Sequence, residues 1–234
     1  MYQDKSFLCV IPARGGSKGI PRKNLVKVNN KPLLQYTIDE ALESKYLDDI
    51  IVSTDDQEIA NVSIKLGANV PYLRPPELAS DYSKTIEAVI HVIEKQKTLG
   101  KEYDYVVVLQ PTQPLRKSWH IDEAIEKIVS EGMENLVSVS EVSDHPILMR
   151  TISKEGFLIS LLNSNSTVRR QDFPEIYKVN GAIYINLISS LNHSTSLNDN
   201  KLAYIMDKKY DLDIDEPMDI EYFKLTQTID KDVK

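Results

Sequence analysis

Residues 7–24 have the sequence FLCVIPARGGSKGIPRKN, in which an apolar run ends at Pro12 and a loop with three glycines follows. No acidic side chain occurs between residues 13 and 38, whereas six cations do: Arg14, Lys18, Arg22, Lys23, Lys27 and Lys31. A buried strand that delivers a flexible cationic loop at its carboxyl end commonly holds a polyphosphate in α/β sheets. Glycines let backbone N–H groups approach the phosphate oxygens, and basic side chains neutralise the charge. The stretch therefore predicts a strand followed by a phosphate-binding loop.

The glycine spacing of this loop excludes two common phosphate-binding motifs. Gly15-Gly16-x-x-Gly19 does not match GxGxxG, which disfavours a dinucleotide-binding oxidoreductase. Lys18 precedes Gly19, whereas a Walker A loop needs Gly-Lys followed by Ser or Thr. A solvated basic turn between a strand and a helix is the plainer alternative, because many charge clusters are no more than that. The run of cations without an acidic neighbour favours the phosphate site.

Short strand patterns alternate with helical patterns on either side of this loop. We expect strands at residues 7–11, 50–53, 70–73, 105–109 and 136–142, and helices at 33–46, 58–66, 85–97 and 118–129. Such alternation is typical of a doubly wound α/β domain with a mostly parallel sheet. Ligands in these folds bind beyond the carboxyl ends of the strands, which is where the cationic loop falls.

The alternation breaks in residues 143–178, which contain two prolines, a polar run and little helical periodicity. Sheet-like sequence resumes at 181–186 and 202–206, and a last helix is expected at 217–225 with Pro in its first turn. We therefore divide the chain into an α/β domain (residues 1–142 and 179–228), a small inserted arm (143–178) and a flexible tail (229–234).

Composition narrows the class of protein. The chain has 234 residues, a net charge of -7 and a sequence pI near 5.2, which disfavours a nucleic-acid binder. Cys9 is the single cysteine, so no intrachain disulfide can form and a reducing compartment is the simplest location. The apolar stretches are too short for a signal peptide or a membrane span. We expect a cytoplasmic protein with neither nucleic-acid nor membrane partners.

A second chemical signal is the sequence DLDID at residues 211–215. If this segment is extended, Asp211, Asp213 and Asp215 project from one face and alternate with two apolar residues. Carboxylates side by side repel one another unless a cation lies between them, and oxygen ligands of this kind suit Mg²⁺. The alternatives are a polar outer face on an edge strand and N-capping of the last helix by Asp215.

The two signals complement each other. A cationic glycine loop and a pair of carboxylates are the two halves of a site for a nucleoside triphosphate with magnesium. The loop would hold the phosphates, and the metal would offset the charge that develops as pyrophosphate leaves. This prediction requires the beginning of the chain and a segment near its end to converge on the same triphosphate.

Five motifs resemble those of bacterial CMP-sialic acid synthetases, the N-acylneuraminate cytidylyltransferases. They are IPARGGSKGIPRKN (11–24), LRPPELASD (73–81), LQPTQPLR (109–116), VNGAIYIN (179–186) and DLDIDEPMD (211–219), in the order of the family. The resemblance implies a Rossmann-like nucleotidyltransferase domain with a small arm that pairs two subunits into a homodimer. It also implies that CTP and a nine-carbon 2-keto sugar acid give the CMP-sugar and pyrophosphate, by attack of the anomeric hydroxyl on the α-phosphorus.

The resemblance further implies roles for individual residues. The triphosphate would be bound by Arg14, Ser17, Lys18 and Lys23, of which Arg14, Lys18 and Lys23 stabilise the leaving group. The nucleotide would be placed by Asn24 and Arg74, with cytosine recognised by the backbone near Ala13 and Ala79. The sugar side would consist of Gln110, Arg170, Lys178 and Tyr184. Asp213 and Asp215 correspond to ligands of Mg²⁺, with Mn²⁺ as an alternative metal, and one of these two carboxylates would accept the hydroxyl proton.

The identity of the acceptor sugar stays open at this point. Legionaminic acid is the alternative to sialic acid, and pseudaminic acid and 2-keto-3-deoxyoctonate fit the first motif less well. Lys178 stands where many relatives carry Arg, and its ammonium is a point charge, not a bidentate fork. A nucleotide-binding protein without catalysis would be expected to have a damaged acidic motif, whereas Asp213 and Asp215 are both present.

Overall fold

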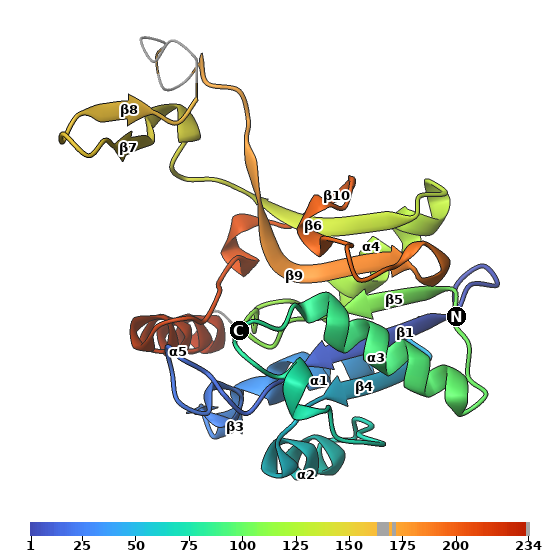
Figure 1. Ribbon diagram of the computed structural model, residues 1–234. Coiled ribbons are helices and arrows are strands. Elements are labelled where there is room, and N and C mark those ends of the chain that lie inside the picture. Colours follow the sequence, from blue (N-terminus) through green and yellow to red (C-terminus); the bar gives the residue numbers. More distant parts are fainter. Residues whose placement is uncertain (163–168, 170–171, 233–234) are drawn as a thin grey trace.

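The computed structural model describes residues 1–162, 169 and 172–232, and its centre is one six-stranded sheet (Figure 1). The strand order is β10-β6-β9-β5-β1-β4. The bounds are β1 (Phe7–Pro12), β4 (Asp49–Ser53), β5 (Tyr105–Val108), β6 (Asn135–Glu141), β9 (Tyr177–Leu187) and β10 (Leu202–Ile205). β1 is parallel to both β4 and β5, β10 is parallel to β6, and β9 runs antiparallel between β5 and β6. The predicted α/β fold with a mostly parallel sheet is confirmed.

Helices cover both faces of this sheet (Figure 1). One face packs against α1 (Leu33–Glu43), α2 (Gln57–Lys65) and α4 (Ser118–Ser130), and the other against α3 (Thr85–Thr98). Alternate residues of β1 divide between the two layers, because successive side chains of a strand point to opposite faces. Cys9 lies in the first core and Val10 in the second, and both are fully buried.

A third, smaller core joins the beginning of the chain to its end. Ile20, which follows the glycines of the first loop, packs in one cluster with Leu212, Ile214 and Phe223. Phe223 belongs to α5 (Pro217–Asp232), which begins at the predicted proline and extends beyond the predicted end at Leu225. The short strands β2 (Lys27–Val28) and β3 (Lys31–Pro32) complete this region. Burial of these apolar side chains fixes the acidic segment beside the cationic loop.

Two segments predicted as extended have no place in the sheet. The predicted strand at residues 70–73 is wrong: a single parallel bridge joins Ile51 to Asn69, and Pro71 then removes an N–H donor that a ladder would need. Residues 211–215 are also outside any strand, although Ile214 N donates to Thr112 O at 2.9 Å. Their alternation survives because the apolar residues are buried in the third core.

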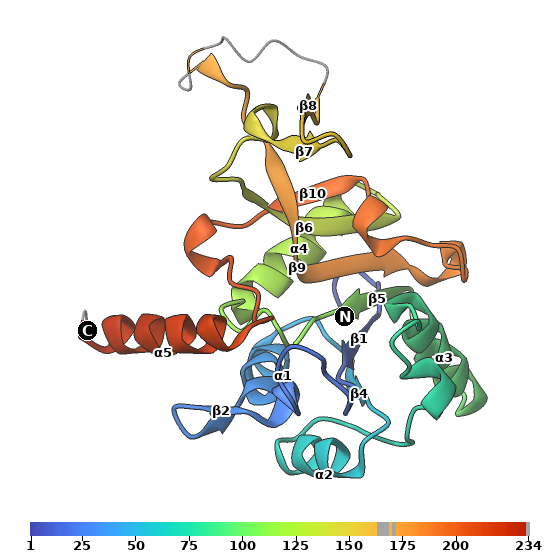
Figure 2. The same ribbon diagram turned by 60° about the vertical axis from the view of Figure 1, so that its left-hand side comes forward.

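The described residues between β6 and β9 project beyond the sheet (Figures 1 and 2). They contain the antiparallel hairpin of β7 (Arg150–Ile152) and β8 (Leu158–Ser160). β9 starts before the predicted residues 181–186, and its first residues pair with the end of β6. Short 3-10 helices occur at Lys23–Leu25, Pro76–Leu78, Pro146–Leu148, Ile188–Ser190, Leu197–Asp199 and Lys208–Tyr210. Among the described residues, none of the helices combines the length and apolarity needed to cross a membrane.

Candidate functional site

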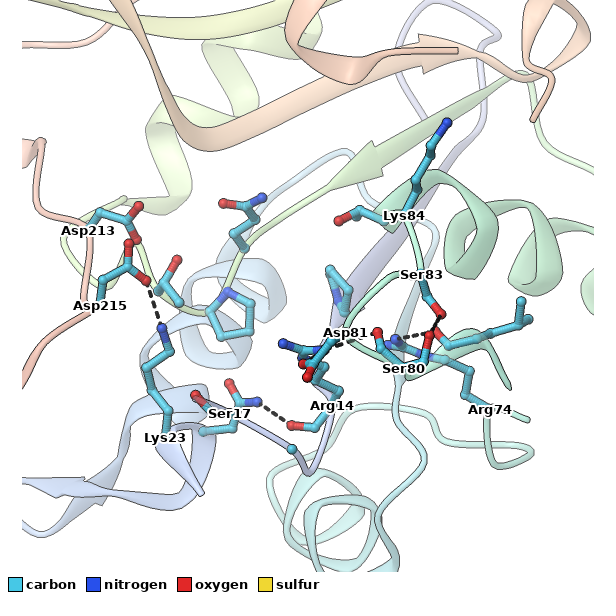
Figure 3. A pocket seen from close by; sticks show the side chains of 18 residues that line it. Arg14, Ser17, Lys23, Arg74, Ser80, Asp81, Ser83, Lys84, Asp213 and Asp215 are labelled. Atoms are coloured by element: carbon cyan, nitrogen blue, oxygen red, sulfur yellow. Dashed lines mark hydrogen bonds and ion pairs between the residues drawn. The ribbon is translucent and has the colours of Figure 1, made fainter. Parts of the chain in front are cut away.

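A cavity of about 370 Å³ lies beyond the carboxyl ends of β1 and β5 (Figure 3). Its wall comes from the loop after β1, the segment before α3, the loop after β5 and the acidic segment before α5. The predicted site residues that line it are Arg14, Ser17, Lys23, Asn24, Arg74, Gln110, Asp213 and Asp215. The cations from the beginning of the chain and the carboxylates from near its end therefore face one space.

Lys23 joins these two parts of the wall directly (Figure 3). Its Nζ lies 2.7 Å from the Ile214 carbonyl oxygen and 2.9 Å from an Asp215 carboxylate oxygen. The backbone of Gly19 approaches the same segment so closely that a Cβ there would lie 2.3 Å from the Asp215 carbonyl oxygen. Only glycine permits this approach without movement of one of the two segments.

Asp213 and Asp215 both line the cavity, and their environment suits a divalent cation. Removal of water from around the Asp213 carboxylate raises its pKa, a hydrogen bond with Thr112 opposes this, and repulsion from Asp215 adds to it. Among the described residues there is no cluster of three or more His, Cys, Asp or Glu side chains that could hold a metal. Mg²⁺ needs only one or two carboxylates when water and phosphate complete its shell, so the pair fits this ion.

Asp211, the third carboxylate of the pattern, does not join the other two. Its nearly buried side chain lies 3.0 Å from the Lys178 ammonium, and neither residue lines the cavity. The expectation of three carboxylates on one face is therefore wrong, because a cation of β9 engages the first of them. The predicted cap at the start of α5 also differs. Asp219 accepts the N–H groups of Asp215 and Glu216, whereas the Asp215 side chain accepts from Lys23.

The cations of the first loop are paired with carboxylates from distant parts of the chain. Arg14 Nη1 and Lys18 Nζ each lie 3.1 Å from a different oxygen of Asp81. Arg22 instead pairs with Asp56 and Glu58. The loop lacks acidic neighbours in sequence, but the fold supplies them from the segment before α3 and from the start of α2. Sequence reasoning missed Asp81, although it ends the LRPPELASD motif.

Arg74 is buried in the wall of the cavity and ties two segments together. Its Nε donates to Ser53 Oγ at 3.0 Å, its Nη2 donates to the Ser53 carbonyl oxygen, and Nη1 lies 3.4 Å from the Leu78 carbonyl oxygen. Burial lowers the pKa of Arg74 to about 10, an effect that the charge of Asp55 opposes. The guanidinium therefore fixes the end of β4 relative to the segment before α3.

The remaining predicted nucleotide-site residues divide into two groups. Asn24 is buried, lines the cavity and donates to the Arg14 carbonyl oxygen at 3.0 Å. Ala13, Lys18 and Ala79 lie beside the cavity and are not part of its lining. Ala13 is fully buried, and its N–H donates to Ser53 O at 2.9 Å. The roles expected of the backbone near Ala13 and Ala79 stay predictions.

A second cavity of about 550 Å³ adjoins the first. Both cavities are lined by Gln110 and by the residues that begin α3. The far wall of the second contains residues 194–198 and Tyr184, whose hydroxyl donates to Asn198 Oδ1 at 2.9 Å. Burial raises the pKa of Tyr184 to about 12, and the nearby Asp213 carboxylate acts in the same direction. Gly181, with a φ of +77°, lies so close that a Cβ there would be 2.6 Å from Gln110 Oε1.

Two predicted sugar-side residues are not placed in either cavity. Lys178 is engaged by Asp211, and Arg170 lies outside the described residues. Residues that line the first cavity without having been predicted are Pro12, Gly16, Leu78, Ser80, Asp81, Ser83, Lys84, Thr85, Pro111 and Thr112. Most of these belong to, or follow shortly after, the motifs at residues 73–81 and 109–116. Membership of these motifs was the sequence feature that could have identified them as site residues.

Comparison with known proteins identifies the family to which the sequence is similar. A family model described as cytidylyltransferase matches residues 8–229. An N-acylneuraminate cytidylyltransferase of Streptococcus agalactiae is 40% identical over 211 residues, which cover 89% of this chain and 50% of that protein. A CMP-N,N'-diacetyllegionaminic acid synthase of Legionella pneumophila is 39% identical over 216 residues, 91% of this chain and 92% of that protein. The chain spans about half the length of the first curated relatives that it matches.

A third relative is similar in sequence, and a solved structure is similar in fold. A pseudaminic acid cytidylyltransferase of Campylobacter jejuni is 33% identical over 220 residues, 93% of this chain and 94% of that protein. Among solved structures, a CMP:2-keto-3-deoxy-manno-octonic acid synthetase complexed with CTP has a TM-score of 0.72 at 17% identity, over 96% of this chain and 99% of that one. At that identity the likeness shows the fold alone.

Proposed function

The chain belongs to the cytidylyltransferase family, and from this premise we propose that it transfers CMP from CTP to a nine-carbon 2-keto sugar acid. The anomeric hydroxyl of the acid attacks the α-phosphorus, a new P–O bond forms, and the bond to the β-phosphate oxygen breaks. Pyrophosphate leaves, and the hydroxyl proton passes to a base. The products are the CMP-sugar and pyrophosphate.

The observation that carries this proposal is the contact of Lys23 with the acidic segment. One ammonium lies within 2.9 Å of both Ile214 O and Asp215, at the edge of a cavity that Arg14 also lines. Cations and a carboxylate pair around one open space match the needs of a triphosphate that carries a metal ion. A nucleotide-binding protein without catalysis would not need the carboxylate pair.

Residues in and beside the first cavity would have separate roles in phosphoryl transfer. Arg14, Lys18 and Lys23 would stabilise the negative charge on the departing pyrophosphate. Asp213 and Asp215 would hold Mg²⁺, or Mn²⁺ as an alternative, which when bound offsets the charge of the phosphate oxygens. One of the two carboxylates would also accept the hydroxyl proton, directly or through water. Position and electrostatics would supply most of the rate enhancement.

The acceptor would occupy the second cavity, which joins the first at Gln110. An N-acylneuraminate is the first candidate, as in the Streptococcus agalactiae relative. Legionaminic acid is the second, because the Legionella pneumophila protein matches at nearly the same identity over its whole length. Pseudaminic acid and 2-keto-3-deoxyoctonate are weaker candidates. We also propose a cytoplasmic location, where CTP is available, and a homodimer formed through the arm.

The experiment that tests the proposal is an acceptor and nucleotide screen. Pyrophosphate release is measured with CTP, UTP, ATP and GTP, each with Mg²⁺ and with N-acetylneuraminic, legionaminic and pseudaminic acids and 2-keto-3-deoxyoctonate. We expect release that requires both CTP and one of the first two acids. Release without an acid would indicate a pyrophosphohydrolase, and CTP binding without release would indicate a regulatory binder; either result would overturn the proposal.

A further inference from the structure

The two cavities share one short stretch of wall at the beginning of α3. Ser83, Lys84 and Thr85 line both spaces, together with Gln110 from the loop after β5. In Figure 3 the Lys84 side chain extends away from the region where Arg14 and Asp81 meet. A ligand group that lies between the phosphates and the second cavity would therefore pass beside Lys84.

Unlike Arg14 and Lys23, Lys84 has no anionic partner among the described residues; Arg74 also has none, but its buried guanidinium donates to Ser53. Arg14 is paired with Asp81 and Lys23 with Asp215. Within residues 1–162, 169 and 172–232, the Lys84 ammonium takes part in no ion pair. It is also the one charged side chain among the described residues that line the second cavity. A solitary cation between two ligand spaces favours an anionic group of the ligand.

We propose that Lys84 is a positioning residue that binds the carboxylate of the acceptor sugar acid. The inference rests on the proposed function, which supplies a 2-keto acid as the acceptor. In the ring form of such an acid, the carboxylate and the attacking hydroxyl are attached to the same carbon atom. A carboxylate held at the boundary of the two cavities would direct the hydroxyl toward the phosphates and the rest of the sugar into the second cavity.

The test is a double-mutant-type cycle in which either the Lys84 ammonium or the carboxylate of the sugar acid is removed. Values of kcat/KM are measured for the preferred acid and for its methyl ester, with the wild type, Lys84→Gln and Lys84→Arg. We expect Lys84→Gln to lower kcat/KM for the acid by about 10- to 100-fold, the range of a hydrogen bond between charged groups. The ester should be used poorly by the wild type, and Lys84→Gln should not impair it further. Lys84→Arg should retain most of the preference for the acid.

Controls separate this role from a structural one and from contact with the nucleotide. Lys95→Gln alters an exposed lysine within α3 that lines neither cavity, and it should leave all constants within about twofold. The Kd for CTP, measured by calorimetry, and the melting temperature should be unchanged in Lys84→Gln. A loss of CTP affinity in that variant would instead assign Lys84 to the triphosphate and would overturn the proposal.

Failure of this inference is distinguishable from failure of the proposed function. If the wild type releases no pyrophosphate with any of the acids, the proposed function fails and the role of Lys84 fails with it. If the wild type is active and Lys84→Gln affects acid and ester equally, the inference alone is wrong. Equal effects would mean that the ammonium does not recognise the carboxylate.

Discussion

Asp213 and Asp211 are two positions apart but have different surroundings, and this pair allows a matched test of the metal site. Asp213 lines the cavity, whereas Asp211 is engaged by Lys178 outside it. We expect Asp213→Asn to lower kcat by about 100-fold or more with Mg²⁺ as the metal, because one metal ligand is lost. Asp211→Asn should keep turnover within about tenfold of the wild type. A near-normal rate in Asp213→Asn, measured by pyrophosphate release, would refute the assignment of the metal ligands.

Asp81 is paired with two cations that the proposed site would offer to a triphosphate. Its carboxylate oxygens lie 3.1 Å from Arg14 Nη1 and 3.1 Å from Lys18 Nζ, and hydrogen bonding with Lys18 lowers its pKa. Both ion pairs are solvent-exposed, so each contributes little to stability. We expect Asp81→Asn to lower the Kd for CTP by about two- to fivefold in calorimetry at low salt, with a smaller difference at high salt.

The control for Asp81 is Asp172→Asn, which removes the exposed ion pair with Arg169 in the arm. This variant should leave the Kd for CTP unchanged, because neither residue lines the first cavity. Weaker CTP binding in Asp81→Asn would show that Asp81 orients the two cations for the phosphates and does not block them.

The roles of single residues were predictable where a local sequence pattern indicates which side chains are buried and which face a ligand. The alternation of Asp213 and Asp215 with Leu212 and Ile214 indicates which side chains are buried and which face a ligand, and the third core keeps that alternation. Asp81 was not predictable in this way, since its partners lie far earlier in the chain and only the fold brings them together. Lys84 was not predictable either, because its proposed role depends on its place between two cavities, and each cavity is formed by several segments of the chain.

At the scale of elements, the contact between the loop after β1 and the segment before α5 is the feature that forms the site. Gly19 is where the backbones approach most closely, and a Cβ would lie 2.3 Å from Asp215 O. We expect Gly19→Ala to lower the melting temperature and to raise the KM for CTP by about tenfold or more, since the segment with Asp215 must shift.

Gly16→Ala is the matched control in the same loop, because a Cβ at that position meets no atom within 4 Å. Its melting temperature should equal that of the wild type. If Gly19→Ala also kept the wild-type melting temperature and KM for CTP, the close approach of the two segments would not be needed for the site.

Helices and strands were predictable where a short stretch of sequence alone determines them. The helices α1 to α4 follow from apolar periodicity, and β5 follows from a continuous apolar run. The predicted strand at residues 70–73 is absent because Pro71 lacks the N–H donor that a strand ladder needs, although its neighbours favour a strand. The segment instead continues to Arg74, whose N–H donates to Thr54 O at 2.7 Å. The antiparallel orientation of β9 depends on the path of the chain through the arm, and the sequence carries no signal for it.

For the whole molecule, the arm presents apolar side chains that nothing in the described chain covers. Ile152, Phe157 and Leu158 are 72%, 71% and 71% exposed on the hairpin that projects beyond the sheet (Figure 2). Several large apolar side chains exposed on one hairpin indicate an interaction surface, and a second copy of the arm is the occupant that the proposed homodimer supplies. We expect a dimer in sedimentation velocity, converted to a monomer by Phe157→Asp combined with Leu158→Asp.

The same variant tests whether the first cavity depends on the dimer. None of the described residues that line that cavity belongs to the arm, so the monomer should bind CTP with a Kd within about twofold of the wild type. The acceptor side is different, because β9 carries Lys178 and leads out of the arm, and we expect a raised KM for the sugar acid. Leu99→Asp, at another exposed apolar residue, directly after α3, is the control that should stay dimeric and active. Loss of CTP binding in the monomer would mean that the partner subunit supports the nucleotide site as well.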